Sequence, residues 1–308
     1  MKKHFKKILA TLLIVLVVAF GFVGNYFYNF GLNPKVDKSG IVNQDSDGSK
    51  EDKTAINKWF DETKQVTEME SVTKNKLVGY KFVNPDAKKW IFVVHGYTSD
   101  AKKMANYIKK FYDMGYSVFA PDLIAHGNSE GDFISMGGYD SDDLVNWVKK
   151  ISAENNNADT ALFGISMGAA TVMNAVGKNL PSNVKAIIAD SSYTSVWDIF
   201  KSELKARFNL PPFPLMQMFR VIAKIQAKYD IKEASVINQV KKSKLPILLI
   251  HGDADDFVPV TMESQIYESL PGEKDQLIVH GAGHTQSRYR EPEAYYKKVF
   301  EFVDKYEK

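Results

Sequence analysis

The 308-residue sequence contains no cysteine. This absence excludes disulfide bonds, thiolate catalysis, zinc sites built from cysteine and attachment of a lipid to an N-terminal cysteine. The sequence also lacks a basic excess. The formal net charge is +3, and four N-terminal lysines alone carry +4 (Lys2, Lys3, Lys6 and Lys7). The rest of the chain therefore has a net charge of 3 − 4 = −1. We therefore expect no nucleic-acid partner, because such a partner requires a basic surface.

The sequence also lacks the spacing of histidines and carboxylates that is typical of metal sites. Four histidines stand near carboxylates, but none forms a pattern such as His-Glu-x-x-His. We therefore expect no bound metal.

Long apolar runs are also absent, with one exception at the N-terminus. The predominantly apolar run at residues 8–30 contains no charged side chain and is interrupted by Asn25 and Asn29. A helix of that length spans roughly 34 Å, enough for a hydrocarbon core of about 30 Å. The run is too long for a signal peptide and no small-x-small cleavage site follows it. A buried core helix is disfavoured because the segment has no polar face. We predict an uncleaved single-pass anchor, with the lysines in the cytoplasm and the body of the protein outside the cell.

The rest of the chain divides into two parts by composition. Residues 33–53 are polar and contain few apolar side chains, which indicates a flexible spacer. The predicted organisation is a basic stub and anchor at 1–32, a spacer at 33–53, and a globular domain at 54–308. Apolar residues at near-helical spacing predict that the domain begins with an amphipathic helix over 54–67.

Strand-like and helical patterns alternate along the domain. Residues 77–83 alternate like a strand, and short apolar runs typical of buried strands occur at 90–94, 117–120, 160–163, 184–189, 246–250 and 276–279. Helical patterns lie between most of them, at 101–114, 139–151, 167–178, 261–269 and 292–306. This alternation predicts an α/β fold with a mostly parallel sheet and helices on both faces. The interval at about 193–240 shows only helical patterns, and we expect it to form a cap over a site at the sheet.

The strongest chemical motif is Gly164-Ile165-Ser166-Met167-Gly168, which lies between a strand pattern and a helix pattern. Glycines on both sides allow a tight turn that exposes the serine hydroxyl at the start of the helix. The motif predicts that Ser166 is a nucleophile. The alternative is a small residue that only caps the helix.

A nucleophilic serine needs a base and an acid, which follow it in the chain order serine, acid, histidine. Asp255 lies in the loop after the strand at 246–250, with Asp253 and Asp256 as competitors for the acid. His284 follows the next strand and a glycine-rich turn. We predict the triad Ser166, Asp255 and His284, and we expect structural roles for the other histidines of the domain (His95, His126, His251 and His280).

A loop that begins at His95 follows the strand at 90–94. A main-chain N–H in such a loop can point at the substrate oxygen, as can the N–H that follows the nucleophile. We therefore assign the oxyanion hole to the N–H groups of Tyr97 and Met167.

These segments together resemble the α/β-hydrolase family, in particular its bacterial members with a His-Gly oxyanion loop, often described as esterases, lipases or serine aminopeptidases. The resemblance covers about residues 77–308. In the family, the acid occupies the fifth position of His-Gly-x-x-Asp-x-x-Val-Pro, which here is Asp255. The family pattern Asp-x-Arg-Gly-x-Gly-x-Ser is incomplete at 122–129, where the arginine and the first glycine are missing. That departure affects a structural turn rather than the triad.

The chemistry implied is acyl transfer through a covalent intermediate, with no cofactor. We favour a carboxylester hydrolase acting on small-molecule or lipid esters near the outer membrane face. One alternative is a peptidase, which needs a site for a charged peptide end, for which Glu203, Arg207 and Arg220 are candidates. Another is a non-catalytic surface-binding protein. The apolar cap residues either line an acyl pocket or pack against the domain (Met216, Met218, Phe219, Val221, Ile222 and Ile225).

Overall fold

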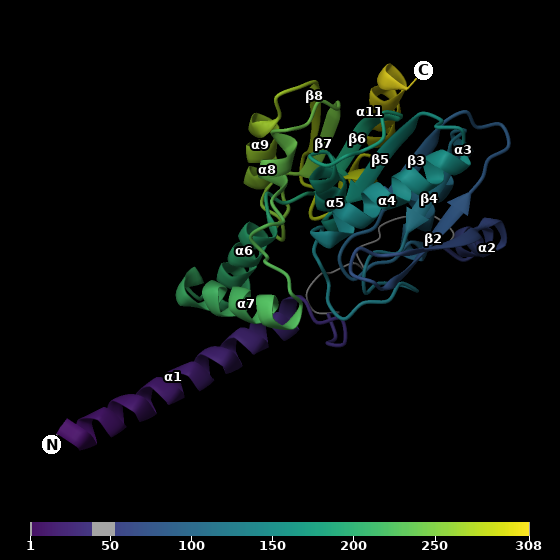
Figure 1. Ribbon diagram of the computed structural model, residues 1–308. Coiled ribbons are helices and arrows are strands. Elements are labelled where there is room, and N and C mark those ends of the chain that lie inside the picture. Colours follow the sequence, from purple (N-terminus) through teal and green to yellow (C-terminus); the bar gives the residue numbers. More distant parts are fainter. Residues whose placement is uncertain (1, 39–52, 308) are drawn as a thin grey trace.

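The computed structural model describes residues 2–38 and 53–307. Its centre is an eight-stranded sheet of order β1-β2-β4-β3-β5-β6-β7-β8 (Figure 1). The strands are β1(Gln65–Glu70), β2(Lys76–Phe82), β3(Trp90–Val94), β4(Ser117–Pro121), β5(Thr160–Ile165), β6(Val184–Asp190), β7(Ile247–Gly252) and β8(Lys274–Val279). β2 pairs antiparallel with both of its neighbours, and the other strand pairs are parallel. The predicted mostly parallel sheet is confirmed.

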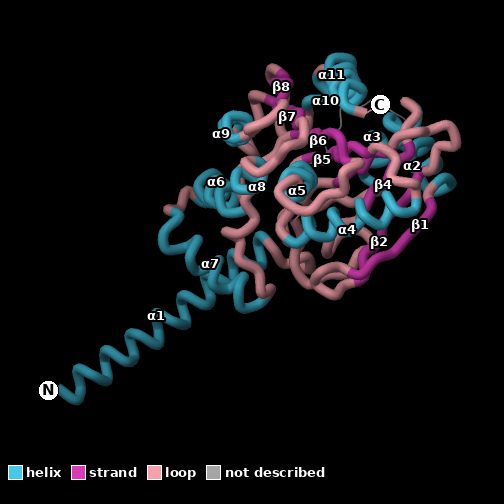
Figure 2. Tube along the Cα trace, turned by 45° about the horizontal axis from the view of Figure 1, so that its top comes forward, coloured by secondary structure: helices cyan, strands magenta, loops and turns pink. Residues whose placement is uncertain are grey.

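Helices cover both faces of the sheet (Figure 2). One buried cluster joins the sheet to α2(Lys53–Thr63), α3(Ala105–Asp113) and α11(Pro292–Tyr306). A second cluster joins the other face to α4(Tyr139–Glu154), α5(Met167–Ala175), α8(Val236–Val240) and α9(Val260–Ser269). Two short helices, η1(Lys102–Met104) and α10(Ser287–Arg290), complete the domain. Because β3, β5 and β7 are buried on both faces, they contain the continuous apolar runs seen in the sequence.

The helix predicted over 54–67 is too long. α2 ends at Thr63, and Val66 belongs to β1, where it pairs with Tyr80 of β2. The β-branched side chains of Val66 and Thr67 favour an extended backbone, and pairing with β2 adds a strand to the edge of the sheet. A six-residue edge strand with only partly buried side chains leaves little periodic signal in the sequence.

The helical cap comprises α6(Val196–Phe208) and α7(Pro212–Gln226), with α8 leading back to the sheet. It connects the end of β6 to the start of β7 and lies beside the sheet, near the C-terminal end of the N-terminal helix (Figure 1). Ser195 is the N-cap residue of α6, and its side-chain oxygen accepts a hydrogen bond from the N–H of Asp198. Within the described residues of 193–240 there is no strand, in agreement with the sequence pattern.

The N-terminal helix α1(Lys2–Gly31) extends away from the body of the protein (Figure 1). By length and composition it is able to cross a membrane. Its last two turns pack against the cap and the main core. Tyr28 in these turns and Leu32, the residue after the helix, are buried. Lys38 donates to the carbonyls of Asn29 and Phe30 at the helix end. The predicted spacer at 33–53 lies mostly in residues 39–52, outside the described residues.

Candidate active site

Ser166 sits on the sharp turn between β5 and α5, with φ +52° and ψ −117°. The flanking glycines are required by close approaches of the backbone. A Cβ at Gly164 would lie 2.3 Å from the carbonyl oxygen of Gly168, and one at Gly168 would lie 2.1 Å from that of Val94. The turn therefore holds a serine in a strained conformation and presents its side chain at the end of the strand, which is the geometry of a nucleophile.

His284 connects Ser166 to Asp255 through its two ring nitrogens. Nε2 of His284 lies 2.9 Å from Oγ of Ser166, and Nδ1 lies 2.8 Å from Oδ2 of Asp255. The structure thus brings together three residues that are separated by up to 118 positions in the chain. The distances suit a relay in which the carboxylate orients the imidazole and the imidazole accepts the serine proton.

The carboxylate of Asp255 is buried and fully engaged. Its Oδ1 accepts hydrogen bonds from the N–H groups of Phe257 and Val258, at 3.0 and 2.8 Å. Its Oδ2 faces both His284 and Nε2 of His251, the latter at 3.2 Å. Burial alone would raise the pKa of Asp255, but the hydrogen bonds from His251 and His284 hold it well below its usual range. Asp255 is therefore an anion at neutral pH.

The two neighbouring carboxylates lie elsewhere. Asp253 accepts hydrogen bonds from Nδ1 of His280, at 2.7 Å, and from the N–H of Gly281, at 2.6 Å, so it fixes the turn after β8. Asp256 is exposed to solvent. Of the three carboxylates in this loop, Asp255 is the one that reaches His284, which favours the sequence-based assignment of the acid.

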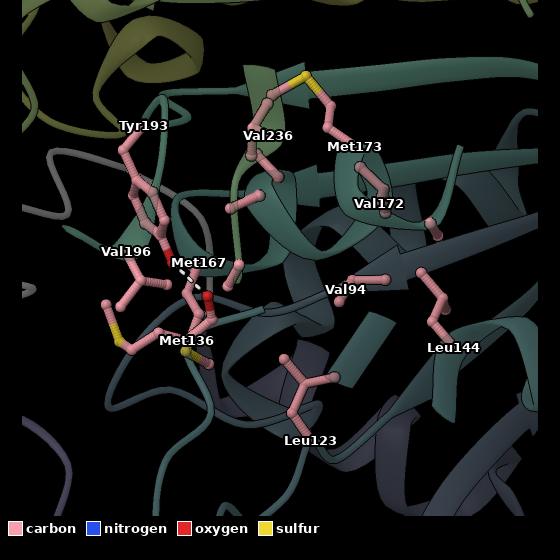
Figure 3. Packing of buried hydrophobic residues seen from close by; sticks show 14 of the residues in the cluster. Val94, Leu123, Met136, Leu144, Met167, Val172, Met173, Tyr193, Val196 and Val236 are labelled. Atoms are coloured by element: carbon pink, nitrogen blue, oxygen red, sulfur yellow. Dashed lines mark hydrogen bonds between the residues drawn. The ribbon is translucent and has the colours of Figure 1, made fainter. Parts of the chain in front are cut away.

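The loop after β3 lies directly against the nucleophile. A Cβ at Gly96 would come within 3.3 Å of Cβ of Ser166, so this position leaves no room for a larger residue without a shift. On the other side, the Met167 side chain packs against the loop of Met136 and the start of the cap at Tyr193, whose hydroxyl donates to the carbonyl of Met136 (Figure 3). Packing on both sides fixes the main chain at Tyr97 and Met167.

His95 holds this loop in place from inside the protein. Its ring is fully buried, with Nδ1 2.8 Å from the carbonyl of Gly96, while Nε2 accepts a hydrogen bond from the N–H of Leu123 at 3.0 Å. Both bonds require a neutral ring that carries its proton on Nδ1. Burial lowers the pKa of His95 from 6.5 to about 4.

This buried histidine makes stability fall in acid. Between pH 6.5 and 4, His95 is protonated in the unfolded chain but stays neutral in the folded protein. The free energy of unfolding therefore decreases as the pH falls through this range. We expect His95 to contribute a loss of about 3 kcal/mol across that range. Urea unfolding at several pH values measures it, with His95→Gln as the comparison. Parallel pH profiles of the two proteins would contradict the prediction.

Tyr97 has a second contact that the sequence does not reveal. Its buried hydroxyl donates a 2.8 Å hydrogen bond to the main-chain carbonyl of Gly31, the last residue of α1. Next to it, the N–H of Ile134 donates to the carbonyl of Leu32 at 2.8 Å. The end of the N-terminal helix is therefore in direct contact with the loop expected to stabilise the oxyanion. Sequence patterns carry no signal for a contact between residues 66 positions apart.

Loss of the Tyr97 hydroxyl should weaken this connection. In Tyr97→Phe the Gly31 carbonyl stays buried without its partner, and we expect a loss of about 1 to 3 kcal/mol in stability. If the bond also positions the loop, kcat for a soluble ester should fall several-fold while KM changes little.

The control is Tyr116→Phe, which removes a buried hydroxyl that donates to Oδ1 of Asp304 just before β4, at the opposite end of the parallel strands from the triad. We expect a smaller loss of stability in this control and no change in kcat. Chemical unfolding and steady-state kinetics on both variants measure the two effects. An unchanged kcat in Tyr97→Phe would show that the bond is structural only.

Charged residues of the cap come near the triad but are paired. Arg207 forms an ion pair with Glu203 and lies 5.8 Å from the ring of Phe257, which in turn lies 4.9 Å from the ring of His284. Burial raises the pKa of Glu203, although the ion pair with Arg207 opposes that effect. Further away, Arg220 binds Asp230 through two nitrogens.

A cavity of about 850 Å³ opens at Ser166 and His284. Its lining includes polar and charged side chains from residues 53–64 and 102–107, among them Asp61, Lys64 and Lys102. The six apolar cap residues named above do not line this cavity. Met216 and Phe219 are buried, and Met218 and Ile222 contact Gly24 of α1. Within residues 2–38 and 53–307, no cluster of three or more histidine or acidic side chains suits a metal ion.

Known protein sequences resemble this chain over part or nearly all of its length. A family model described as serine aminopeptidase, S33 matches residues 85–233. The uncharacterized protein YqkD of Bacillus subtilis is 28% identical over 302 residues, which cover 97% of each chain.

Comparison with solved structures gives similar folds. The esterase Pf2001 of Pyrococcus furiosus superposes with a TM-score of 0.67 at 23% identity, over 84% of this chain and 98% of the esterase. The acylaminoacyl peptidase of Pyrococcus horikoshii gives a TM-score of 0.60 at 18% identity, over 80% of this chain and 42% of the peptidase. At these identities the likeness establishes the fold and leaves the substrate open.

Proposed function

This chain belongs to the α/β-hydrolase family, and we propose that it is a serine hydrolase that cleaves carboxylic esters. Ser166 is the nucleophile, His284 the base and Asp255 the acid. The observation that carries this proposal is the hydrogen-bonded chain from Ser166 Oγ through His284 to Asp255, with distances of 2.9 and 2.8 Å. Ser166 and His284 also line a cavity.

The proposed reaction proceeds through an acyl-enzyme. As Oγ of Ser166 attacks the ester carbonyl carbon, Nε2 of His284 accepts the hydroxyl proton. The tetrahedral intermediate collapses when the C–O bond to the alcohol breaks and His284 returns the proton to the leaving oxygen. Water then attacks the acyl carbon and gives a proton to His284. When the bond between that carbon and Oγ breaks, His284 returns the proton to Oγ, which releases the acid and restores the Ser166 hydroxyl.

Two features support this assignment of the base. Nδ1–H of His284 donates to an ionised carboxylate, so the proton acceptor faces Ser166. Asp255 also stabilises the imidazolium that forms in the transition state.

The developing oxyanion needs donors on the opposite side of the carbonyl carbon from His284. We assign this role to the main-chain N–H groups of Tyr97 and Met167. Support comes from the position of Gly96 against Ser166 and from the packing that fixes both segments. Donors held in place before the substrate binds need no reorganisation during the reaction.

An ester substrate is favoured over a peptide by the pairing of the charged cap residues. A peptidase that recognises a peptide end needs an available charge near the triad. The candidates Glu203 and Arg207 form an ion pair with each other, and Arg220 is bound to Asp230. None of the three lines the described cavity, and Asp61, which does line it, is paired with Lys64 and Lys102.

We propose further that α1 is an uncleaved membrane anchor, with the hydrolase domain on the outer face. The apolar run, its exposure along residues 8–19 and the lysines that precede it support this location. The reaction then takes place close to the membrane, where lipid or acyl esters are available. The division into stub and anchor, spacer and domain at 1–32, 33–53 and 54–308 is part of the same proposal.

A comparison of substrates tests the proposed reaction. The full chain in detergent is assayed with p-nitrophenyl esters of increasing acyl length and with aminoacyl p-nitroanilides, with Ser166→Ala as the blank. We expect Ser166-dependent hydrolysis of the esters and little cleavage of the anilides. A higher kcat/KM for the anilides would replace the esterase proposal with the peptidase alternative.

A further inference from the structure

The uncovered part of α1 is short for a membrane span. Residues 8–23 are the apolar stretch before the helix meets the cap at Gly24. These sixteen residues measure about 24 Å along the helix, whereas the hydrocarbon core of a bilayer is about 30 Å thick. About 6 Å of hydrocarbon is left over, which corresponds to the next helical turn at 24–27. That turn is the one that α7 covers.

Close contact fixes α7 at this level of α1. A Cβ at Gly24 would lie 2.6 Å from the carbonyl oxygen of Met218 and 2.6 Å from Cγ1 of Ile222, so the two backbones approach as closely as small residues allow. Beside this crossing, two side-chain amides form a hydrogen bond between the helices: Nε2 of Gln226 donates to Oδ1 of Asn25 at 2.8 Å. α7 thus crosses α1 where α1 leaves the body of the protein (Figures 1 and 2).

The stripe of α7 that contacts α1 is only half covered. Met218, Val221, Ile222 and Ile225 follow the i, i+3, i+4, i+7 spacing of one helical face. α1 contacts Met218 and Ile222, whereas Val221 stays 41% exposed and Ile225 69% exposed.

Apolar exposure continues at the start of α7 and in the connection before it. Phe213, in the first turn of α7, is 73% exposed, and Leu210, in the connection, is 37% exposed. Four large apolar side chains are therefore uncovered within residues 210–225, adjacent to the candidate span. Lys224 and Lys228 are exposed on either side of Ile225, and an apolar face flanked by lysines is typical of helices that lie in a membrane interface with anionic headgroups.

We propose that α7 and the connection before it form a second membrane contact, which inserts Phe213, Val221 and Ile225 into the outer edge of the bilayer. This inference rests on the proposed role of α1 as the anchor. The partner is the lipid surface itself, because the exposed stripe is continuous with α1 and lies where the span is about one turn too short. The second contact fixes the rotation of the domain about the axis of α1, which a single membrane-spanning helix leaves free.

The absence of cysteine allows a direct test on the full chain. Single variants Phe213→Cys and Ile225→Cys are labelled with an environment-sensitive fluorophore and reconstituted into vesicles of phosphatidylcholine and phosphatidylglycerol. Leu13→Cys reports on the anchor. Met114→Cys and Ile278→Cys are matched controls, because these apolar residues are exposed, at 50% and 38%, on other parts of the protein. Quenching is measured with doxyl-labelled lipids and with aqueous iodide.

We expect the labels at 213 and 225 to be quenched several-fold more by doxyl lipids, and several-fold less by iodide, than the labels at 114 and 278. If the label at 13 is quenched by lipid while those at 213 and 225 respond to iodide like the controls, the second contact is wrong and the anchor stands. If the label at 13 is not quenched by lipid either, the proposed anchor fails and this inference fails with it.

Discussion

Ser166→Ala should fold normally and lose nearly all hydrolytic activity. The side chain has little room to rearrange on the strained turn, and alanine keeps its volume apart from one oxygen, so the structural cost is small. Without Oγ there is no acyl-enzyme, and removal of the nucleophile from a triad lowers kcat by about 10⁶-fold. A fluorophosphonate probe gives a second readout, because it reacts only with an activated serine. The wild-type protein should be labelled and Ser166→Ala should not.

The matched control for labelling is Ser264→Ala on the surface of α9, which should react like the wild-type protein. Circular dichroism and thermal unfolding establish that each variant is folded. Equal labelling of Ser166→Ala and wild type would place the nucleophile elsewhere. Failure of the folded wild-type protein to label would favour the non-catalytic binding protein over a hydrolase.

Asp255→Asn should give the second-largest loss, about 10⁴-fold in kcat. An amide at this position has no charge to stabilise the imidazolium, and its NH2 group favours the wrong tautomer of His284. Because Asp255 also accepts bonds from two main-chain N–H groups and from His251, some loss of stability should accompany the loss of activity. Kinetics with a soluble ester, together with urea unfolding, separate the two effects.

Asp253→Asn and Asp256→Asn are the matched controls, since each removes a carboxylate from the same loop. Asp256 is exposed, and we expect kcat to change less than two- to three-fold in its variant. Asp253→Asn should loosen the turn after β8, where the carboxylate binds His280 and Gly281, with a smaller effect on kcat than Asp255→Asn. A larger loss in either control than in Asp255→Asn would reassign the acid.

Local patterns predicted most of the sheet. Strands such as β3 and β5 are apolar because both of their faces are buried, so their sequence alone marks them. The edge strand β1 escaped prediction because its side chains are half exposed and its partner β2 lies in a different segment. β1 is stabilised by its pairing with β2. The sequence of residues 65–70 alone gives no information about that partner.

The candidate triad was also predictable, for a chemical reason. Its three members stand at ends of strands, and parallel strands bring their carboxyl ends to one edge of the sheet, so order along the chain implies proximity. The choice among Asp253, Asp255 and Asp256 came from resemblance to a family pattern. In the structure, Oδ2 of Asp255 lies 2.8 Å from Nδ1 of His284.

The N-terminal helix shows the difference between the two sources of information most clearly. An apolar helix at residues 8–30, long enough for a bilayer, is predictable from the residues alone, because hydrophobicity and length are local properties. The packing of its last turns against the domain is visible only in the folded protein, where Gly24 lies against α7 and the Gly31 carbonyl accepts a hydrogen bond from Tyr97. Such contacts depend on the shapes of surfaces that exist only after the cap and the sheet have folded.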